Sequence, residues 1–523
     1  MNRSGWLPRW RAGSFAGALM VSLLAGAVSV FSFAPYALWP LQILSLAGWF
    51  FILLQPQWSL RQVGWLAWAG GTVALSINVC WLWVAMARYG DMPAALAALA
   101  LLLFAAGMAV YPWLFALLGV FLQRRWRLSL TATLLLLFPA LWTLSEWLRG
   151  WLLSGFPWAI GGYAHSDSPL AGYAPLVGVY GVGYVAALLA AILALLLSAG
   201  IGRARRTALV LLAVVLLASG ALLRSVVWTQ PSGTALSVRL LQGNIAQDIK
   251  FDPQHLQDTL DLYRSMLTAT PADLIITPET ALPVPISMLP PDYLSSLQNY
   301  AAAHGSAILL GVIMQDGSDR YANSVLGLST EYAAASYRYD KHHLVPFGEF
   351  IPYGFAWFVR WLHIPMGELT PGAARQAPMR VGTQFVLPNI CYESLFGEEI
   401  ADKLRAQQQA GQGVASILLN VSNLAWYGDS IGIPQHLQFA RMRVLETGRP
   451  WLSATNTGAT VHIRADGVVQ AQLPFLRRAS LTASVQGQTG MTPYLRWGNR
   501  TVVWLALFML LAARCSVPWT GKQ

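Results

Sequence analysis

The chain has 523 residues, of which 55% are hydrophobic and only 11% are charged. Soluble globular proteins carry charge on about 25% of their residues, so this composition excludes an ordinary soluble protein and indicates a membrane protein. The net charge of +11 does not indicate nucleic-acid binding, because most of the excess positive charge lies in short loops between apolar segments.

Eight apolar segments are expected to cross a membrane. The first is interpreted as a membrane helix rather than a signal peptide, because a second apolar segment follows almost at once. Seven segments precede a long polar region, at residues 14–33, 38–54, 63–86, 93–122, 129–147, 174–199 and 207–226, and the eighth lies at 500–514.

Basic residues in alternate loops predict the orientation of these segments. Lysine and arginine accumulate on the cytoplasmic side of membrane proteins, which places the N-terminus in the cytoplasm and the polar region outside. The loops concerned contain Arg61, then Arg124, Arg125 and Arg127, then Arg203, Arg205 and Arg206. The predicted organisation is a seven-helix membrane domain (1–228), an outer domain (229–495), and a last membrane helix with a short cytoplasmic tail (496–523).

Two features of the spans disfavour other functions. Ionisable residues are almost absent from the span interiors, with Glu146 as the main exception, whereas ion transporters keep such residues there. Residues 181–186 match the dinucleotide-binding pattern G-x-G-x-x-A, but no strand precedes them. These small residues therefore predict close packing between helices.

The polar region alternates short apolar runs with helical patterns, which predicts an α/β fold. The expected strands are 236–241, 274–277, 307–313, 324–328, 384–390, 416–421 and 451–455. The expected helices are 254–268, 290–304, 393–405 and 435–447.

Cys391 ends one of these strands and precedes residues that favour a helix. The other cysteines, Cys80 and Cys515, lie in or beside apolar segments, so Cys391 has no evident disulfide partner. A thiol at a helix N-terminus faces unpaired backbone N–H groups and the positive end of the helix dipole, which predicts a stabilised thiolate. The structural alternative is a cysteine buried only for packing.

Glu279 and Lys341 also follow strand ends. Groups at the carboxyl ends of strands converge in α/β sheets, so we expect these two side chains to meet Cys391. A carboxylate, an ammonium and a thiol suit covalent acyl transfer: Glu279 takes the thiol proton, Cys391 attacks a carbonyl, and Lys341 stabilises the oxyanion. The structural alternative for Glu279 is a carboxylate at the start of a helix or in a loop. The alternative for Lys341 is a solvated loop lysine.

Three motifs resemble those of the nitrilase (carbon-nitrogen hydrolase) superfamily: residues 278–281 (PETA), 341–349 (KHHLVPFGE) and 390–393 (ICYE). With the membrane segments and the motifs at 33–36, 155–158 and 489–494, nearly the whole chain is similar to the bacterial apolipoprotein N-acyltransferases.

The resemblance implies an αββα sandwich facing the periplasm of the inner (cytoplasmic) membrane. It implies Glu279 as the general base, Lys341 as the oxyanion stabiliser and Cys391 as the nucleophile, with Glu349 as a second carboxylate and Tyr392 and Glu393 shaping the site. The implied reaction moves an acyl chain from a phospholipid, typically phosphatidylethanolamine, through a cysteine thioester to the α-amine of a diacylglyceryl-cysteine on an apolipoprotein. This is the last step of lipoprotein maturation, and acyl transfer from an ester needs no cofactor.

The chain departs from the family pattern at two positions. In residues 422–428 (SNLAWYG), which include Trp426, Leu424 stands where an aspartate is common, and the nearby Asp429 is a candidate to compensate. Phe251 stands where many members carry tryptophan, so we expect the aromatic contact with lipid to survive.

An aromatic segment at residues 353–364 is interpreted as an interfacial lid over the lipid entrance, with a buried core helix as the alternative. Four of its apolar side chains share one helical face: Trp357, Phe358, Trp361 and Leu362. Acyl chains favour the bilayer by about 0.8 kcal/mol per methylene, so a site held against the membrane avoids extracting them.

Other functions remain as alternatives. An amidase or hydrolase could use the same three residues with water as the acceptor, and a lipid or lipoprotein carrier could bind without catalysis. His342 and His343 lack further ligands at a recognisable spacing, so no metal site is expected.

Overall fold

The computed structural model describes residues 14–198, 200–332, 336–354, 368–411 and 413–516. The chain forms two compact units. The first comprises residues 1–83, 93–226 and 497–523, and the second comprises residues 84–92 and 227–496. The second unit thus recruits a short segment from the N-terminal half of the chain.

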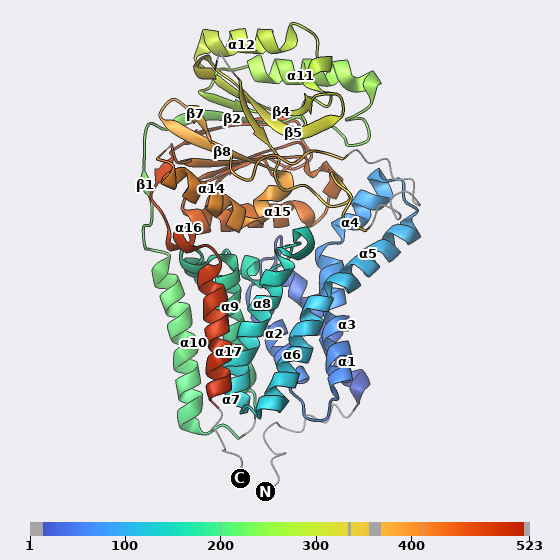
Figure 1. Cartoon of the computed structure of the whole chain (residues 1–523), viewed down its shortest axis with the longest axis vertical. Helices are drawn as coiled ribbons and strands as arrows, with labels where there is room; N and C mark the ends of the chain where they lie inside the picture. The colour runs from blue at the N-terminus through green and yellow to red at the C-terminus, as the bar shows by residue number, and fades with distance from the viewer. Residues whose placement is uncertain (1–13, 199, 333–335, 355–367, 412, 517–523) are drawn as a thin grey trace. The chain divides into compact units, whose positions relative to one another are not determined.

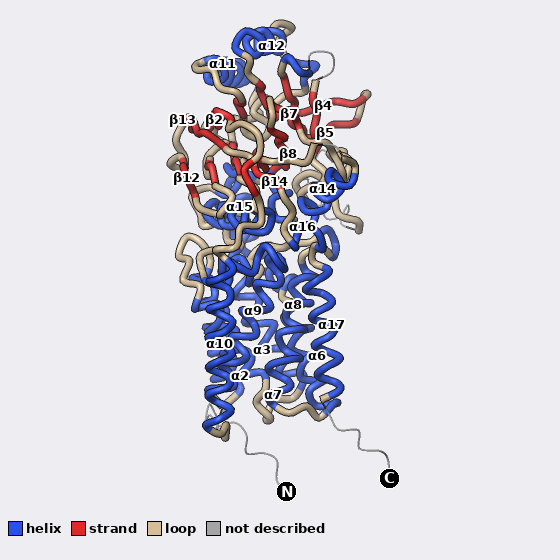
Figure 2. Tube along the Cα trace, turned by 90° about the vertical axis from the view of Figure 1, so that its left-hand side faces the viewer, coloured by secondary structure: helices blue, strands red, loops and turns tan. Residues whose placement is uncertain are grey.

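The first unit is a bundle of apolar helices lying side by side (Figure 2). Its main helices are α1 (Phe15–Ser29), α2 (Pro40–Leu53), α3 (Leu60–Asn78), α5 (Ala94–Met108), α6 (Val110–Trp126), α8 (Phe138–Arg149), α9 (Ala174–Leu196), α10 (Arg203–Leu223) and α17 (Arg500–Cys515). Each of the eight segments expected from the sequence overlaps at least one of these helices, and the segment 93–122 overlaps both α5 and α6. The unit therefore has the composition and architecture of a membrane domain.

Helix length limits which of these elements can span a bilayer. Five helical segments of the described chain are long and apolar enough, and a bent pair of helices is a sixth candidate. In the bent pair, α3 ends at Asn78, and α4 (Trp81–Val84) follows with a π-helical turn at Ala85–Tyr89, so the expected continuous span at 63–86 is wrong. Helices α2 and α17 have only 14 and 16 residues, whereas a perpendicular span takes about 20.

Glycines allow close backbone packing in this unit. A Cβ atom placed on Gly26 of α1 would lie 2.3 Å from the carbonyl oxygen of Gly70 in α3, and one on Gly183 would lie 3.3 Å from Oε2 of Glu146. Gly183 belongs to the segment that matched the dinucleotide pattern. Its contact with Glu146 confirms that these small residues serve helix packing.

We expect Gly26→Ala to lower the midpoint of thermal unfolding of the detergent-solubilised protein. The added methyl group overlaps the Gly70 carbonyl, and overpacking of this kind costs about 1–3 kcal/mol. Gly48→Ala in α2 is the matched control, because a Cβ atom there meets nothing within 4 Å. Equal midpoints for the two variants would contradict the close α1–α3 packing.

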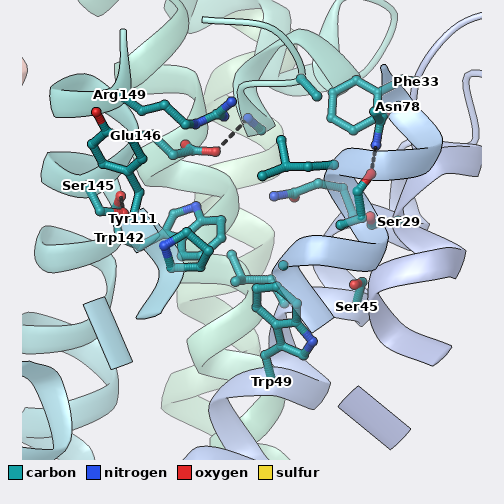
Figure 3. Close-up of a pocket in the computed structure, with 18 residues that line it drawn as sticks. Ser29, Phe33, Ser45, Trp49, Asn78, Tyr111, Trp142, Ser145, Glu146 and Arg149 are labelled. Atoms are coloured by element: carbon teal, nitrogen blue, oxygen red, sulfur yellow. Dashed lines mark hydrogen bonds between the residues drawn. The ribbon is translucent and has the colours of Figure 1, made fainter. Parts of the chain in front are cut away.

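Glu146 and Arg149, at the end of α8, hold the loop that follows. The Gly161 N–H donates to Glu146 Oε1 at 2.8 Å, and Arg149 Nη1 donates to the carbonyl oxygens of Phe156 (3.2 Å) and Trp158 (2.7 Å). Both side chains also line a cavity of about 90 Å³ among the helices (Figure 3). Glu146, the main ionisable residue within the expected spans, therefore has a structural role, because it helps to fix the loop that carries the 155–158 motif.

The second unit is a sandwich of two six-stranded sheets between two pairs of helices (Figure 1). The first sheet has the order β13 (Ala479–Val485), β2 (Leu236–Gln242), β3 (Leu274–Ile276), β4 (Ala307–Asp316), β5 (Arg320–Leu328) and β6 (Tyr337–Asp340). The second has the order β12 (Val469–Gln472), β11 (Val461–Ile463), β10 (Trp451–Thr455), β9 (Ile417–Ser422), β8 (Gln384–Ile390) and β7 (Met379–Val381). Strands β1 (Gln230–Pro231) and β14 (Gln488–Thr489) pair separately.

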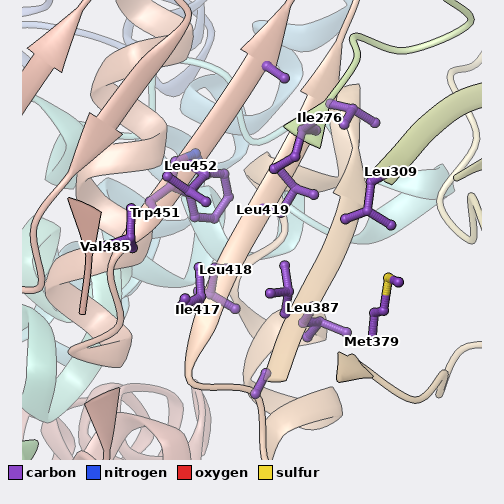
Figure 4. Close-up of a cluster of buried hydrophobic side chains, with 14 of the residues drawn as sticks. Ile276, Leu309, Met379, Leu387, Ile417, Leu418, Leu419, Trp451, Leu452 and Val485 are labelled. Carbon is purple, nitrogen blue, oxygen red and sulfur yellow. The ribbon is translucent and has the colours of Figure 1, made fainter. Parts of the chain in front are cut away.

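Alternating side chains build the layers of this sandwich. In β3, Leu274 and Ile276 point into the core between the sheets, whereas Ile275 packs beneath α11 (Leu256–Thr268) and α12 (Tyr293–His304). The central core joins Leu309 of the first sheet to residues such as Leu419 of the second (Figure 4). Helices α14 (Gly397–Gln409) and α15 (Gly432–Thr447) cover the other face of the second sheet.

The seven expected strands and four expected helices are all present, which confirms the αββα sandwich. The seven expected ranges do not include β1, β6, β7, β11, β12, β13 and β14. All of these except β13 are short, and β13 carries mostly small residues without a continuous apolar run. The helix expected at 393–405 begins only at Gly397, because Cys391–Leu395 form a 3₁₀ turn.

Candidate active site

Three strand ends bring Glu279, Lys341 and Cys391 together. Glu279 follows β3 and Lys341 follows β6, and these two strands run in the same direction within the first sheet. Cys391 follows β8 of the second sheet. The expected convergence at strand ends is confirmed, but the site joins the edges of two stacked sheets rather than one crevice of an open sheet.

The three side chains are in direct contact. Lys341 Nζ lies 3.3 Å from Glu279 Oε1 and 2.7 Å from Glu349 Oε1, and the lysine side chain is only 1% exposed. The Cys391 thiol is hydrogen-bonded to the Glu279 carboxylate. A nucleophile, a base and a cation therefore form one connected cluster, and Glu349 supplies a second carboxylate to the lysine.

The charges of the cluster follow from its burial and its ion pairs. Burial raises the pKa of Glu279, but Lys341 and then Lys250 outweigh that effect and leave the pKa below its usual value. Burial lowers the pKa of Lys341, but Glu349 and Glu279 reverse this, so its pKa is raised. At neutral pH the site holds a charged carboxylate beside a charged lysine.

The Cys391 thiol is protonated in this resting site. Burial, followed by the charge of Glu279, raises its pKa, and Lys341 opposes them only in part. The expected stabilisation of a thiolate by a helix N-terminus is therefore wrong, since α14 begins six residues after Cys391. Such a thiol needs a base in contact with it, and Glu279 occupies that place.

Backbone and amide groups orient the base. Asn323 Nδ2 donates to Glu279 Oε1 at 2.7 Å, and the Asn423 N–H donates to Oε2 at 2.8 Å. These donors favour the ionised carboxylate. Sequence reasoning missed both asparagines, because nothing in their local pattern indicates that their donors point at one carboxylate.

The turn at Cys391 is strained and is held by its carbonyl. Cys391 has a φ of 52°, in the left-handed region that non-glycine residues rarely adopt. Its carbonyl oxygen accepts from Asn420 Nδ2 at 3.2 Å and from the buried His436 ring. With this φ the chain bends away from the direction of β8 at Cys391. The two hydrogen bonds to the carbonyl oxygen hold the bend in place.

Glu393 ties the strand ends of the two sheets together. Its Oε2 accepts the Ile390 N–H at 2.7 Å, and its Oε1 accepts the His342 N–H at 2.9 Å. Tyr339 donates to the same carboxylate, and Lys403 Nζ donates to the Tyr339 hydroxyl at 2.7 Å. Glu393 thus fixes the residues beside Cys391 and beside Lys341.

Glu393→Gln is expected to lower the free energy of unfolding by about 3 kcal/mol, because an amide nitrogen would face buried N–H donors and Lys403 would lose its counter-charge. Thermal unfolding of the full chain in detergent measures this loss. Glu368→Gln, at an exposed position, is the control. A midpoint for Glu393→Gln equal to that of the control would remove Glu393 from this role.

The other residues expected around the site occupy its surroundings. Tyr392 is buried, with its ring 5.1 Å from that of Phe396. Phe251 and Trp426 are 52% and 41% exposed, and Trp426 meets the Tyr89 ring at 5.9 Å. Both are large apolar side chains available to an apolar substrate.

Two expectations about this region receive different answers. Leu424 is fully buried and Asp429 is exposed, so the two side chains lie in different environments. The expected lid side chains Trp357, Phe358, Trp361 and Leu362 lie outside the described residues.

The histidines beside Lys341 have protein partners. His342 Nδ1 lies 2.8 Å from the Gly372 carbonyl oxygen, and His343 Nδ1 lies 2.7 Å from Glu399 Oε1. Across the described parts of the chain, no cluster of three or more His, Cys, Asp or Glu side chains is placed to hold a metal ion.

Comparison with known proteins agrees with this architecture. Residues 25–192 match the apolipoprotein N-acyltransferase N-terminal domain, and residues 237–494 match the carbon-nitrogen hydrolase domain. An apolipoprotein N-acyltransferase of Ralstonia nicotianae is 48% identical over 493 residues, covering 94% of this chain and 92% of the relative. The chain belongs to the apolipoprotein N-acyltransferase family.

Other members of the apolipoprotein N-acyltransferase family are similarly close over the full length. The protein of that name from Chromobacterium violaceum is 41% identical, covering 96% of this chain and 94% of the relative. Among solved structures, an amidase from Nesterenkonia sp. aligns with 16% identity and a TM-score of 0.35, covering 52% of this chain and 96% of that chain.

Proposed function

We propose that this protein transfers an acyl chain from a membrane phospholipid to the α-amine of the diacylglyceryl-cysteine of an apolipoprotein, through a thioester on Cys391. The observation that carries the proposal is the contact between Cys391, Glu279 and Lys341 in a chain that belongs to this family. Acyl transfer through a thiol needs this set of groups: a nucleophile, a base in contact with it and a fixed cation.

In the first half-reaction Glu279 takes the proton of Cys391 as the sulfur attacks an ester carbonyl of the phospholipid. Lys341 stabilises the oxyanion that forms. The C–O bond then breaks, the leaving alkoxide takes the proton from Glu279, and a lysophospholipid departs. Cys391 keeps the acyl group as a thioester, and Glu279 is again a carboxylate.

In the second half-reaction the neutral α-amine of the acceptor attacks the thioester. Glu279 takes the proton that the amine loses, and Lys341 again stabilises the oxyanion. The C–S bond breaks, the sulfur recovers the proton from Glu279, and the amide product leaves. Atoms and charges balance over the cycle, and the enzyme returns to its starting state.

The membrane setting follows from the substrates. We place the enzyme in the bacterial inner membrane with residues 229–495 in the periplasm, and phosphatidylethanolamine as the donor, because the basic loops and the family support this arrangement. A membrane-impermeant thiol reagent added to spheroplasts is expected to label Cys391. Labelling only after the membrane is opened would place Cys391 in the cytoplasm and contradict the proposed orientation.

The main alternative is a hydrolase that uses the same three residues and passes the acyl group to water. Purified protein incubated with phospholipid and a diacylglyceryl lipopeptide separates the two activities by mass spectrometry. We expect an N-acylated lipopeptide and an equal amount of lysophospholipid. Free fatty acid in place of the lipopeptide product would support the hydrolase, and neither product would support a non-catalytic carrier.

A further inference from the structure

A second lysine lies behind the proposed base. Lys250, in the loop after β2, is 3% exposed. Its Nζ donates to the main-chain carbonyl oxygen of Glu279 at 3.0 Å and to the Thr280 hydroxyl at 2.7 Å. Neither bond involves the Glu279 carboxylate, which Lys341 contacts. Lys341 therefore contacts the side chain of Glu279, and Lys250 contacts its main chain.

The turn that Lys250 holds is strained and tightly packed. Thr280 has a φ of 45°, an unfavourable value for a β-branched residue. On the other side, the turn lies directly on the backbone of β4, because a Cβ atom on Gly311 would come within 2.0 Å of the Pro278 oxygen and 2.9 Å of Glu279 Cα. Lys250 binds the main-chain carbonyl of Glu279 and the side-chain hydroxyl of Thr280, so it fixes the position of the backbone from which the Glu279 side chain extends.

The lysine also places a charge beside the reacting groups. Burial lowers the pKa of Lys250 to about 8, against the opposing effects of Glu279 and Cys391, so the ammonium form predominates at neutral pH. A buried ammonium is costly unless it is paired. Here its hydrogen bonds go to neutral oxygens, and the nearby negative charge is that of Glu279.

We propose that Lys250 is a positioning residue of the site, which holds the strained Glu279–Thr280 turn and places a second positive charge beside the proposed base. This inference rests on the proposed role of Glu279 as the base. It adds a second cation to the triad of Glu279, Lys341 and Cys391, with a role that differs from oxyanion stabilisation.

The charge of Lys250 acts on Glu279 together with that of Lys341. The other groups that influence Glu279 or respond to it are Asn323, Asn423, Cys391, Tyr427 and His436, and Glu349 shares Lys341. Lys341 and Lys250 are the cations that lower the Glu279 pKa. Removing the Lys250 charge must raise the Glu279 pKa. The acidic limb of the pH–rate profile, where the acylation rate rises as Glu279 loses its proton, must then move to higher pH.

The test measures the rate of Cys391 acylation by phospholipid against pH for the full-length protein in detergent. For Lys250→Met we expect the acidic limb to move up by about one pH unit and the plateau rate to fall about tenfold. Lys250→Arg keeps the charge and should leave the limb in its wild-type position. Thr280→Val removes one hydrogen bond without removing the charge, and should lower the rate without moving the limb.

The variants also separate this inference from the proposed function. If wild-type Cys391 is not acylated at any pH, the proposed function fails. If the wild type is acylated and the limb of Lys250→Met stays in place, or the limb of Lys250→Arg moves with it, the role of Lys250 is wrong. Should Lys250→Met fail to fold, as judged by thermal unfolding, Lys250→Gln takes its place with the same expected shift, and an unshifted limb overturns the proposal.

Discussion

Cys391→Ala is expected to lower kcat/KM for N-acylation by at least about 10⁴-fold, because it removes the atom that carries the acyl group. The thiol is the group that Glu279 contacts, and the strained turn at Cys391 serves to present it. The assay follows acylated lipopeptide by mass spectrometry with protein reconstituted in phospholipid vesicles.

Cys80→Ala supplies the matched control for this experiment. Cys80 lies in the first unit, whereas Cys391 lies in the second, so the control removes a thiol without touching the proposed site. We expect its activity to stay within about twofold of the wild type. N-acylation that survives in Cys391→Ala would exclude the thioester mechanism.

Lys341→Arg is expected to lower kcat by about 10²–10³-fold although it preserves the charge. Nζ lies in an enclosed space between Glu279 and Glu349, at 3.3 and 2.7 Å from their oxygens. A planar guanidinium is larger than an ammonium and cannot occupy this point without displacing one carboxylate. Steady-state rates at saturating lipopeptide measure the loss.

Arg338→Lys is a suitable control for that substitution, because Arg338 lies three residues earlier and is 28% exposed in its ion pairs with Asp316 and Asp340. Partly exposed ion pairs contribute little, so we expect a change below about twofold. Near-normal rates for Lys341→Arg would show that the oxyanion is stabilised by other groups.

Strand ends were the part of the site that could be predicted from the sequence. Apolar runs that stop at Glu279 and Cys391 indicate where β3 and β8 end, and the structure places both residues there. The sandwich also follows from short apolar runs such as Leu274–Ile276, whose side chains are buried on both faces of the sheet. Such patterns can be read from the sequence because a strand buried between layers needs apolar side chains wherever it occurs.

The contacts that tune the site could not be predicted, since they join residues distant along the chain. Lys250 donates to the main-chain carbonyl of Glu279, and the Asn423 N–H, after a strand of the second sheet, donates to the Glu279 carboxylate. The protonated state of Cys391 has the same origin: burial and Glu279 exceed the effect of a helix that begins only at Gly397. Electrostatic balance depends on three-dimensional distances, which sequence spacing does not provide.

The most direct test of the account is the mass of the Cys391 peptide after the purified protein meets phospholipid without acceptor. We predict one acyl group on Cys391, retained until a diacylglyceryl lipopeptide is added and then transferred to its α-amine. An unmodified Cys391 in a preparation that still produces N-acylated lipopeptide would contradict the account.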